Sequence, residues 1–92
     1  MNLVLNIENK NWNYKAKADR GGIHYFFDFK NGWGASVIKF YGSYGYEQDL
    51  WELAVLKNKE LHYDNPVANG DVCGYLTDKE VNKLLRQIEN FK

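Results

Sequence analysis

Three side chains in this 92-residue sequence are candidates for nucleophilic or acid–base chemistry: Cys73, His24 and His62. A catalytic cysteine needs a base that lowers the pKa of its thiol and a donor that stabilises the developing oxyanion. The segment around Cys73, DVCGYL, supplies neither, and it is typical of a packed turn that leads into a helix. We therefore interpret Cys73 as a structural thiol, and we expect no catalytic residue.

His62 and Asp64 would share one face of a strand, as two metal ligands can. A stable site takes three or four protein ligands, and no third candidate lies nearby in the sequence. Carboxylate pairs such as Asp49 and Glu52 are more often solvated than catalytic. The sequence thus predicts no metal site, no cofactor and no enzymatic activity.

The segment GSYGYEQ, residues 42–48, places Tyr44 and Tyr46 among glycines directly after Tyr41. G-x-x-G spacing occurs in KH domains between helices, and phosphate-binding loops lead straight into a helix, whereas strands flank this segment. Either the rings fold back over the end of the sheet, or they anchor a partner, because tyrosine offers a large amphipathic surface at low entropic cost. We predict a partner-binding surface of Tyr41, Tyr44 and Tyr46, extended by Trp33.

The segment KNGWGASVIKF, residues 30–40, shares positions with the first RNA-binding motif of RRM domains. Ala35 and Ser36 stand where that motif has an aromatic residue and a valine, so the match fails. The 12 basic residues are balanced by 12 acidic ones, whereas a protein that neutralises phosphates needs a basic excess. We therefore do not expect nucleic acid as a partner.

Apolar and polar residues alternate through the N-terminal two thirds, which is typical of half-buried strands. The predicted strands cover residues 2–8, 12–18, 23–30, 34–41 and 50–57. The dipeptide Asn31-Gly32 is a strong hairpin signal, and a two-residue turn there places Tyr25 opposite Ile38. On this register the buried face carries Ile23, Tyr25, Phe27, Phe29, Ile38, Phe40, Trp51, Leu53 and Val55. The outer face carries His24, Phe26, Asp28, Lys39, Tyr41 and Glu52.

Thr77 and Glu80 have the T-x-x-E spacing of a capping box, which predicts a helix over residues 78–91. Its apolar stripe suits packing on a sheet and consists of Val81, Leu84, Leu85, Ile88 and Phe91. We predict an α+β fold in which an antiparallel β-meander of about five strands carries one C-terminal amphipathic helix on one face. Residues 1–92 form a single domain in this prediction.

The single cysteine allows no internal disulfide and favours a reducing compartment. No apolar run approaches the roughly 18 residues of a membrane span, and no signal segment opens the chain. We therefore expect a cytoplasmic protein that does not interact with membranes.

Five blocks, FKNGWGASVI, SYG, LWELAVL, YDNPV and DVCGYLTDKEV, resemble a family of small phage- and prophage-encoded accessory proteins. The family pattern is FKNGYGASVI, SYGG, LWELAVL, YDTPITDDV and GYLT, in the same order with similar spacing, and the resemblance runs from about Phe29 to Val81. This chain has Trp33 where the family has Tyr, Asn65 where it has Thr, and ANGD where it has TDD. Those departures leave the expected fold intact, and no function is inferred from the 62–71 loop.

The family carries no assigned activity, so the resemblance implies only an accessory protein in the cytoplasm of a bacterial host. Such proteins often act by binding. We expect a host protein complex as the partner, with stoichiometric inhibition of a defence complex, as by anti-CRISPR proteins, as the specific form. The alternatives are a homodimer, a small-ligand or nucleic-acid-binding module that uses the 41–46 loop, and a structural phage subunit.

Overall fold

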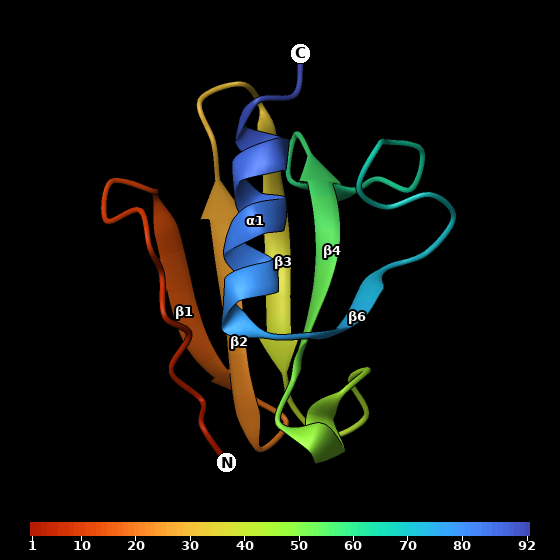
Figure 1. Ribbon diagram of the computed structural model, residues 1–92. Coiled ribbons are helices and arrows are strands. Elements are labelled where there is room, and N and C mark those ends of the chain that lie inside the picture. Colours follow the sequence, from red (N-terminus) through yellow and green to blue (C-terminus); the bar gives the residue numbers. More distant parts are fainter.

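An antiparallel sheet carries the fold, and one C-terminal helix lies across one of its faces (Figure 1). The computed structural model describes residues 1–92. The elements are β1 (Tyr14–Asp19), β2 (Gly22–Asp28), β3 (Trp33–Lys39), the 3-10 helix η1 (Tyr46–Gln48), β4 (Trp51–Lys57), β5 (Glu60–Leu61), β6 (Cys73–Leu76) and α1 (Asp78–Glu89). Strands β1 to β5 follow one another as a meander, and β6 pairs with β4. The predicted α+β meander with a C-terminal helix is confirmed.

Helix α1 begins where the sequence predicts. The Thr77 hydroxyl accepts a hydrogen bond from Glu80 N (3.2 Å), and the Glu80 carboxylate accepts one from Thr77 N (2.9 Å). This reciprocal capping box satisfies N–H groups that the first helical turn leaves without partners. Val81, Leu85 and Ile88 are fully buried between the helix and the sheet.

Residues 2–8, predicted as the first strand, are extended but pair with no strand. That prediction is wrong, because the backbone N–H groups of this segment donate to side chains instead. Leu5 N donates to Tyr25 Oη (3.1 Å), and a further N–H of the segment donates to the buried Asn82 side chain (2.9 Å). Leu5 and Ile7 point into the core, so the alternating pattern reflects an extended segment that closes the core beside α1 (Figure 1).

Each end of the other four predicted strands lies within two residues of its observed position, and the short strands β5 and β6 were not predicted. The β2–β3 hairpin has a three-residue loop, residues 30–32, instead of a two-residue turn. Phe29 closes the loop, because its carbonyl accepts from Gly32 N (3.2 Å) and its N–H donates to the Trp33 carbonyl (2.9 Å). Gly32 (φ 86°) takes the left-handed position that ends such a loop.

The three-residue loop shifts the pairing by one residue and turns β3 over relative to the prediction. Tyr25 pairs with Val37 instead of Ile38. Ile38 and Phe40 therefore lie on the outer face of the sheet, away from α1, and Lys39 points toward the core side, contrary to the predicted register. The rest of the predicted buried face is confirmed by burial or packing against the core, namely Ile23, Tyr25, Phe27, Phe29, Trp51, Leu53 and Val55.

Asn31, in the same loop, caps the other end of α1. Its side-chain amide donates to the carbonyl oxygens of Ile88 (3.0 Å), Glu89 (2.9 Å) and Phe91 (3.0 Å). Ile88 and Glu89 end α1, and Phe91 follows it. Carbonyls at a helix C-terminus lack the i+4 N–H partner that those of the helix interior have. The hairpin and the helix are thereby joined at the end of the molecule that carries the C-terminus (Figure 1).

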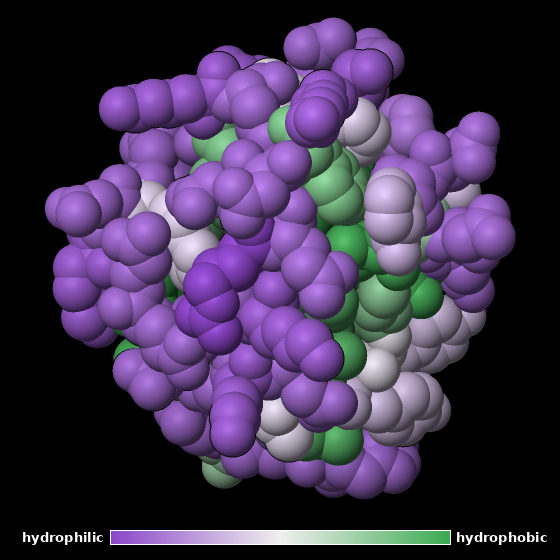
Figure 2. Space-filling view, turned by 45° about the horizontal axis from the view of Figure 1, so that its top comes forward, coloured by the Kyte–Doolittle hydropathy of each residue, from purple (hydrophilic) through white to green (hydrophobic).

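The helix and the N-terminal segment cover one face of the sheet and leave the other face open. Figure 2 shows the helix side, tilted so that its upper end comes forward; most of this surface is hydrophilic, and hydrophobic residues show mainly in a narrow strip. No helix combines the length and the hydrophobicity that crossing a membrane requires.

Candidate functional site

Four tyrosines gather at the end of the sheet where β3 passes into β4 and where β6 ends. We call Tyr41, Tyr44, Tyr46 and Tyr75 the tyrosine patch. They line a depression of about 370 Å³ together with the other residues of the 42–48 loop. Tyr41 is 78% exposed, Tyr75 57% and Tyr44 50%, whereas Tyr46 is half-buried and its ring meets that of Tyr41 edge to face. The structure thus brings the three predicted tyrosines together and adds Tyr75.

A bulge in β6 presents Tyr75 to solvent. Trp51 pairs with Leu76 and Leu53 with Cys73, so a single residue of β4 faces two residues of β6. Tyr75 has φ 59°, in the left-handed region that costs an L-residue roughly 1–2 kcal/mol. Bulges of this kind redirect side chains, and strained residues of this kind concentrate at functional sites.

Gly74 and Gly45 let the loop and the bulge approach closely. A Cβ at Gly74 would lie 2.5 Å from the Cβ of Tyr44, and one at Gly45 would lie 3.0 Å from the Cα of Tyr75. Gly45 also has φ 98°, which larger residues rarely adopt. The Tyr44 ring is therefore seated against the β6 backbone, and Tyr75 N donates to the Tyr44 carbonyl (3.3 Å).

The buried Lys39 anchors the loop from below. Its side chain is 2% exposed, and Nζ donates to Asp49 Oδ1 (2.9 Å) and to the Asn2 carbonyl (2.7 Å). Nζ also lies 4.2 Å from the centre of a Trp51 ring, an arrangement that favours a cation. The hydrogen bond from Lys39 holds the pKa of Asp49 below its ordinary value. This ion pair joins the end of β3, the end of the loop and the N-terminal segment.

Further hydrogen bonds fix the loop between its ends. The Ser43 hydroxyl accepts from Phe40 N (3.2 Å) and donates to the Phe40 carbonyl (2.8 Å). Tyr44 N donates to the Glu52 carboxylate (2.9 Å), which reaches across from β4. The tyrosine rings are therefore carried on a backbone that is tied down at several points.

Trp33 does not lie with the tyrosines. It begins β3, whereas the tyrosine loop follows the end of that strand, so the two lie at opposite ends of the sheet. Trp33 is 7% exposed and makes edge-to-face contacts with Phe91 and His62 at ring-centre distances of 4.9 Å. We therefore leave Trp33 out of the candidate surface.

Cys73 and His62 have local structural partners. Burial, followed by the charge of Asp71, raises the pKa of Cys73, the opposite of the shift that activates a thiol. The Cys73 thiol donates to the Val67 carbonyl (3.3 Å), and His62 Nδ1 is hydrogen-bonded to the amide of Asn65 (3.1 Å). The chain holds no group of three His, Cys, Asp or Glu side chains placed to bind a metal ion.

His24 and Ser36 form a polar pair on the outer face that the sequence did not reveal. His24 Nε2 lies 2.6 Å from Ser36 Oγ, and His24 Nδ1 lies 3.7 Å from Asp19 Oδ2. A carboxylate, an imidazole and a hydroxyl follow one another here as they do in the catalytic triad of a hydrolase. However, the 3.7 Å between Asp19 and His24 is long for the hydrogen bond that orients the imidazole in such a triad. In addition, β3 lies between β2 and β4, so its N–H groups are engaged in pairing rather than free to stabilise an oxyanion.

The register explains why this pair was missed. The predicted pairing put Ser36 opposite Phe27 on the core face, whereas the observed pairing puts Ser36 opposite Phe26 on the outer face, diagonal to His24. No protein-family model, curated protein or solved structure matches the chain.

Proposed function

We propose that the protein acts by binding a protein partner through the tyrosine patch. One observation supports this most strongly: the chain adopts a left-handed conformation at Tyr75 to hold a ring that is 57% exposed. A residue whose only role was to fill the core would gain little from such a conformation. Exposed tyrosines contribute strongly to the binding energy when a partner desolvates them.

The anchored loop reduces what binding would have to order. Lys39, Ser43 and Glu52 already fix the backbone that carries Tyr41, Tyr44 and Tyr46. Association normally loses free energy to the ordering of loops and side chains, so a loop that is ordered beforehand favours affinity.

The charge of the surface favours a protein partner over nucleic acid. Glu47 is the one charged residue that lines the depression, and no lysine or arginine is among the lining residues. A phosphate backbone would meet no cation there, whereas apolar rings with a polar rim are typical of protein interfaces.

The resemblance to phage accessory proteins supports a partner inside a bacterial host cell. The specific form that we propose is stoichiometric binding to a host protein complex, with inhibition of a defence complex, as by anti-CRISPR proteins. Binding of this kind needs no catalytic residue on this chain.

The test is affinity capture from a bacterial lysate with three baits and a bait-free control resin. The baits are the wild type, the Tyr41→Ala/Tyr75→Asn double variant and Tyr63→Ala. Tyr63 is a matched control, because it is 42% exposed and lies outside the patch. We expect at least one host protein that the wild type and Tyr63→Ala retain equally and the double variant loses. Equal retention by the folded double variant would refute the proposed surface.

A further inference from the structure

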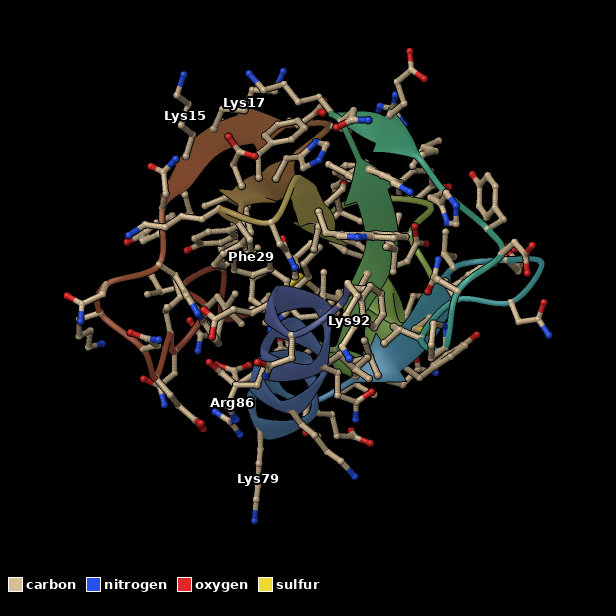
Figure 3. The ribbon with its side chains drawn as sticks, turned by 90° about the horizontal axis from the view of Figure 1, so that it is seen from above. Lys15, Lys17, Phe29, Lys79, Arg86 and Lys92 are labelled. Carbon is tan, nitrogen blue, oxygen red and sulfur yellow. The ribbon has the colours of Figure 1, made fainter.

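The outer face of the sheet, opposite α1, is concave. Strand β1 on one side and the β4–β5 hairpin on the other curl away from the helix (Figure 3). The resulting groove has a volume of about 610 Å³ and is lined by residues of all five meander strands. That volume lies within the range of pockets that hold small molecules, roughly 300–1,000 Å³. No helix covers this face.

Two aromatic rings rise side by side from β2 into the groove. The rings of His24 and Phe26 stack at 3.8 Å between centres, with 23° between their planes. Leu56 and Leu61 continue the apolar lining from β4 and β5, and Leu61 is itself exposed. Gly34 lines the groove from β3 and has no side chain that could fill it. A planar ring would find both a stacking surface and aliphatic contacts here.

The His24–Ser36 pair supplies one oriented polar group in this groove. The charge of the Asp19 carboxylate, 3.7 Å from Nδ1, attracts the ring proton to that nitrogen without a short hydrogen bond. In this tautomer Nε2 accepts the hydrogen bond from the Ser36 hydroxyl. The free lone pairs of Ser36 Oγ are then available to accept a hydrogen bond. A donor on the ligand, such as an amino group, matches this acceptor.

The rim of the groove carries a positive excess. Lys15 and Lys59 line it from opposite sides, whereas Asp28 is the one carboxylate among the lining residues. Lys17 lies on the same face, with Nζ 5.6 Å from the centre of the Phe26 ring. Figure 3 shows Lys15 and Lys17 reaching from β1 on the side of the sheet away from the helix. An anionic group on the ligand would be attracted to this rim.

From these features we propose that the outer groove binds a small planar aromatic anion that also carries a hydrogen-bond donor. The ring extends the stacked pair on the face of Phe26 that His24 does not cover, the donor meets Ser36 Oγ, and the anion lies toward Lys15 and Lys59. Two kinds of molecule share this chemistry, namely aminoaryl carboxylates and purine mononucleotides. This site lies on a different face from the tyrosine patch and does not depend on the function proposed for it.

The test is a titration of the ¹⁵N-labelled protein with 6-amino-2-naphthoate and with AMP, followed by amide chemical shifts. Saturable shifts confined to outer-face residues of β1–β5 would support the proposal, and the ligand that gives them identifies the source of the chemistry. Saturation by AMP but not by adenosine would assign the anion to a phosphate. Absence of saturable shifts with both ligands at millimolar concentration, or shifts centred on the tyrosine patch, would overturn it.

Two variants assign the contacts in the same titration. Ser36→Ala should lower the affinity for 6-amino-2-naphthoate at least threefold and leave that for 2-naphthoate, which lacks the donor, unchanged. Lys15→Gln/Lys59→Gln should weaken both naphthoates at least fivefold. The control Lys79→Gln/Lys83→Gln removes the same charge from α1, where Lys79 points into solvent (Figure 3), and should change neither affinity. If both double lysine variants lost the same affinity, the ligand would be attracted only by the net charge of the protein, and the proposed site would be contradicted.

Discussion

At the scale of single residues, Tyr75 combines a left-handed backbone with an exposed ring. Asparagine tolerates this conformation better than any other non-glycine residue, so Tyr75→Asn relieves strain while it removes ring contacts. We expect these effects to offset each other, with a change below about 1 kcal/mol in the free energy of unfolding measured by urea denaturation. The buried Tyr25→Ala, as a reference, should cost about 3–5 kcal/mol. A comparable loss for Tyr75→Asn would show that the ring is part of the core.

His24, on the outer face, makes the stability of the folded protein depend on pH. Burial is the main cause that lowers its pKa below the ordinary value of 6.5; Lys17 and Arg20 act in the same direction, and Asp19 opposes them. The unfolded chain therefore takes up a proton at a higher pH than the folded protein does. Stability should be full above pH 6.5 and should fall as the pH drops from 6.5 through the lowered pKa.

The measurement is the urea midpoint between pH 7.5 and pH 5, for the wild type and for His24→Gln. The urea midpoint of the wild type should fall as the pH is lowered through this range, and that of His24→Gln should not show this fall. Asp49 and Glu80 also have lowered pKa values, but their ordinary values are 3.8 and 4.5, so their contributions are lost only at lower pH. An unchanged slope in His24→Gln would contradict the assignment to His24.

At the scale of elements, α1 is stabilised by its N-terminal cap and by its packing on the sheet. Thr77→Ala removes the capping hydroxyl and should lower the free energy of unfolding by roughly 1 kcal/mol. Ile88→Ala opens a cavity between helix and sheet and should lower it by about 2–5 kcal/mol. Thermal or urea unfolding ranks the two directly. A larger loss for Thr77→Ala would mean that the helix does not pack on the sheet as described.

Asn31 ties the β2–β3 hairpin to the helix C-terminus. Asn31→Asp keeps the shape of the side chain but removes the amide donor and places a negative charge against three carbonyl oxygens. Since the helix C-terminus carries partial negative charge, we expect a loss of roughly 1–3 kcal/mol in the free energy of unfolding at pH 7. The loss should shrink below pH 4, where the aspartate is protonated. A pH-independent effect would exclude the electrostatic cause.

At the scale of the whole molecule, periodicity predicted the architecture because each element follows its own rule. The capping box and the apolar stripe located α1, and alternation located four strands. Alternation could not separate a paired strand from residues 2–8, whose N–H groups find side-chain partners far along the chain. The Asn31-Gly32 signal likewise suits two loop lengths, and only the packed core selects between them.

The sequence predicted only the part of the candidate surface that depends on residues close together in the chain. Tyr41, Tyr44 and Tyr46 are neighbours in a glycine-rich loop, so their proximity follows from the sequence. Tyr75 joins them only through the pairing of β6 with β4 and the bulge within it. The buried position of Lys39 requires Asp49 and Asn2 to converge on it, which no local pattern indicates.

The central claim is that the tyrosine patch binds a protein partner. The most direct test is the dissociation constant of the captured host protein, purified, for the wild type and for Tyr41→Ala/Tyr75→Asn. We predict at least a tenfold increase for the double variant, no change for Tyr63→Ala, and less than a threefold change between 50 and 500 mM salt, since the contacts are aromatic. A dissociation constant that the double variant leaves unchanged, while its unfolding curve matches that of the wild type, would contradict the account.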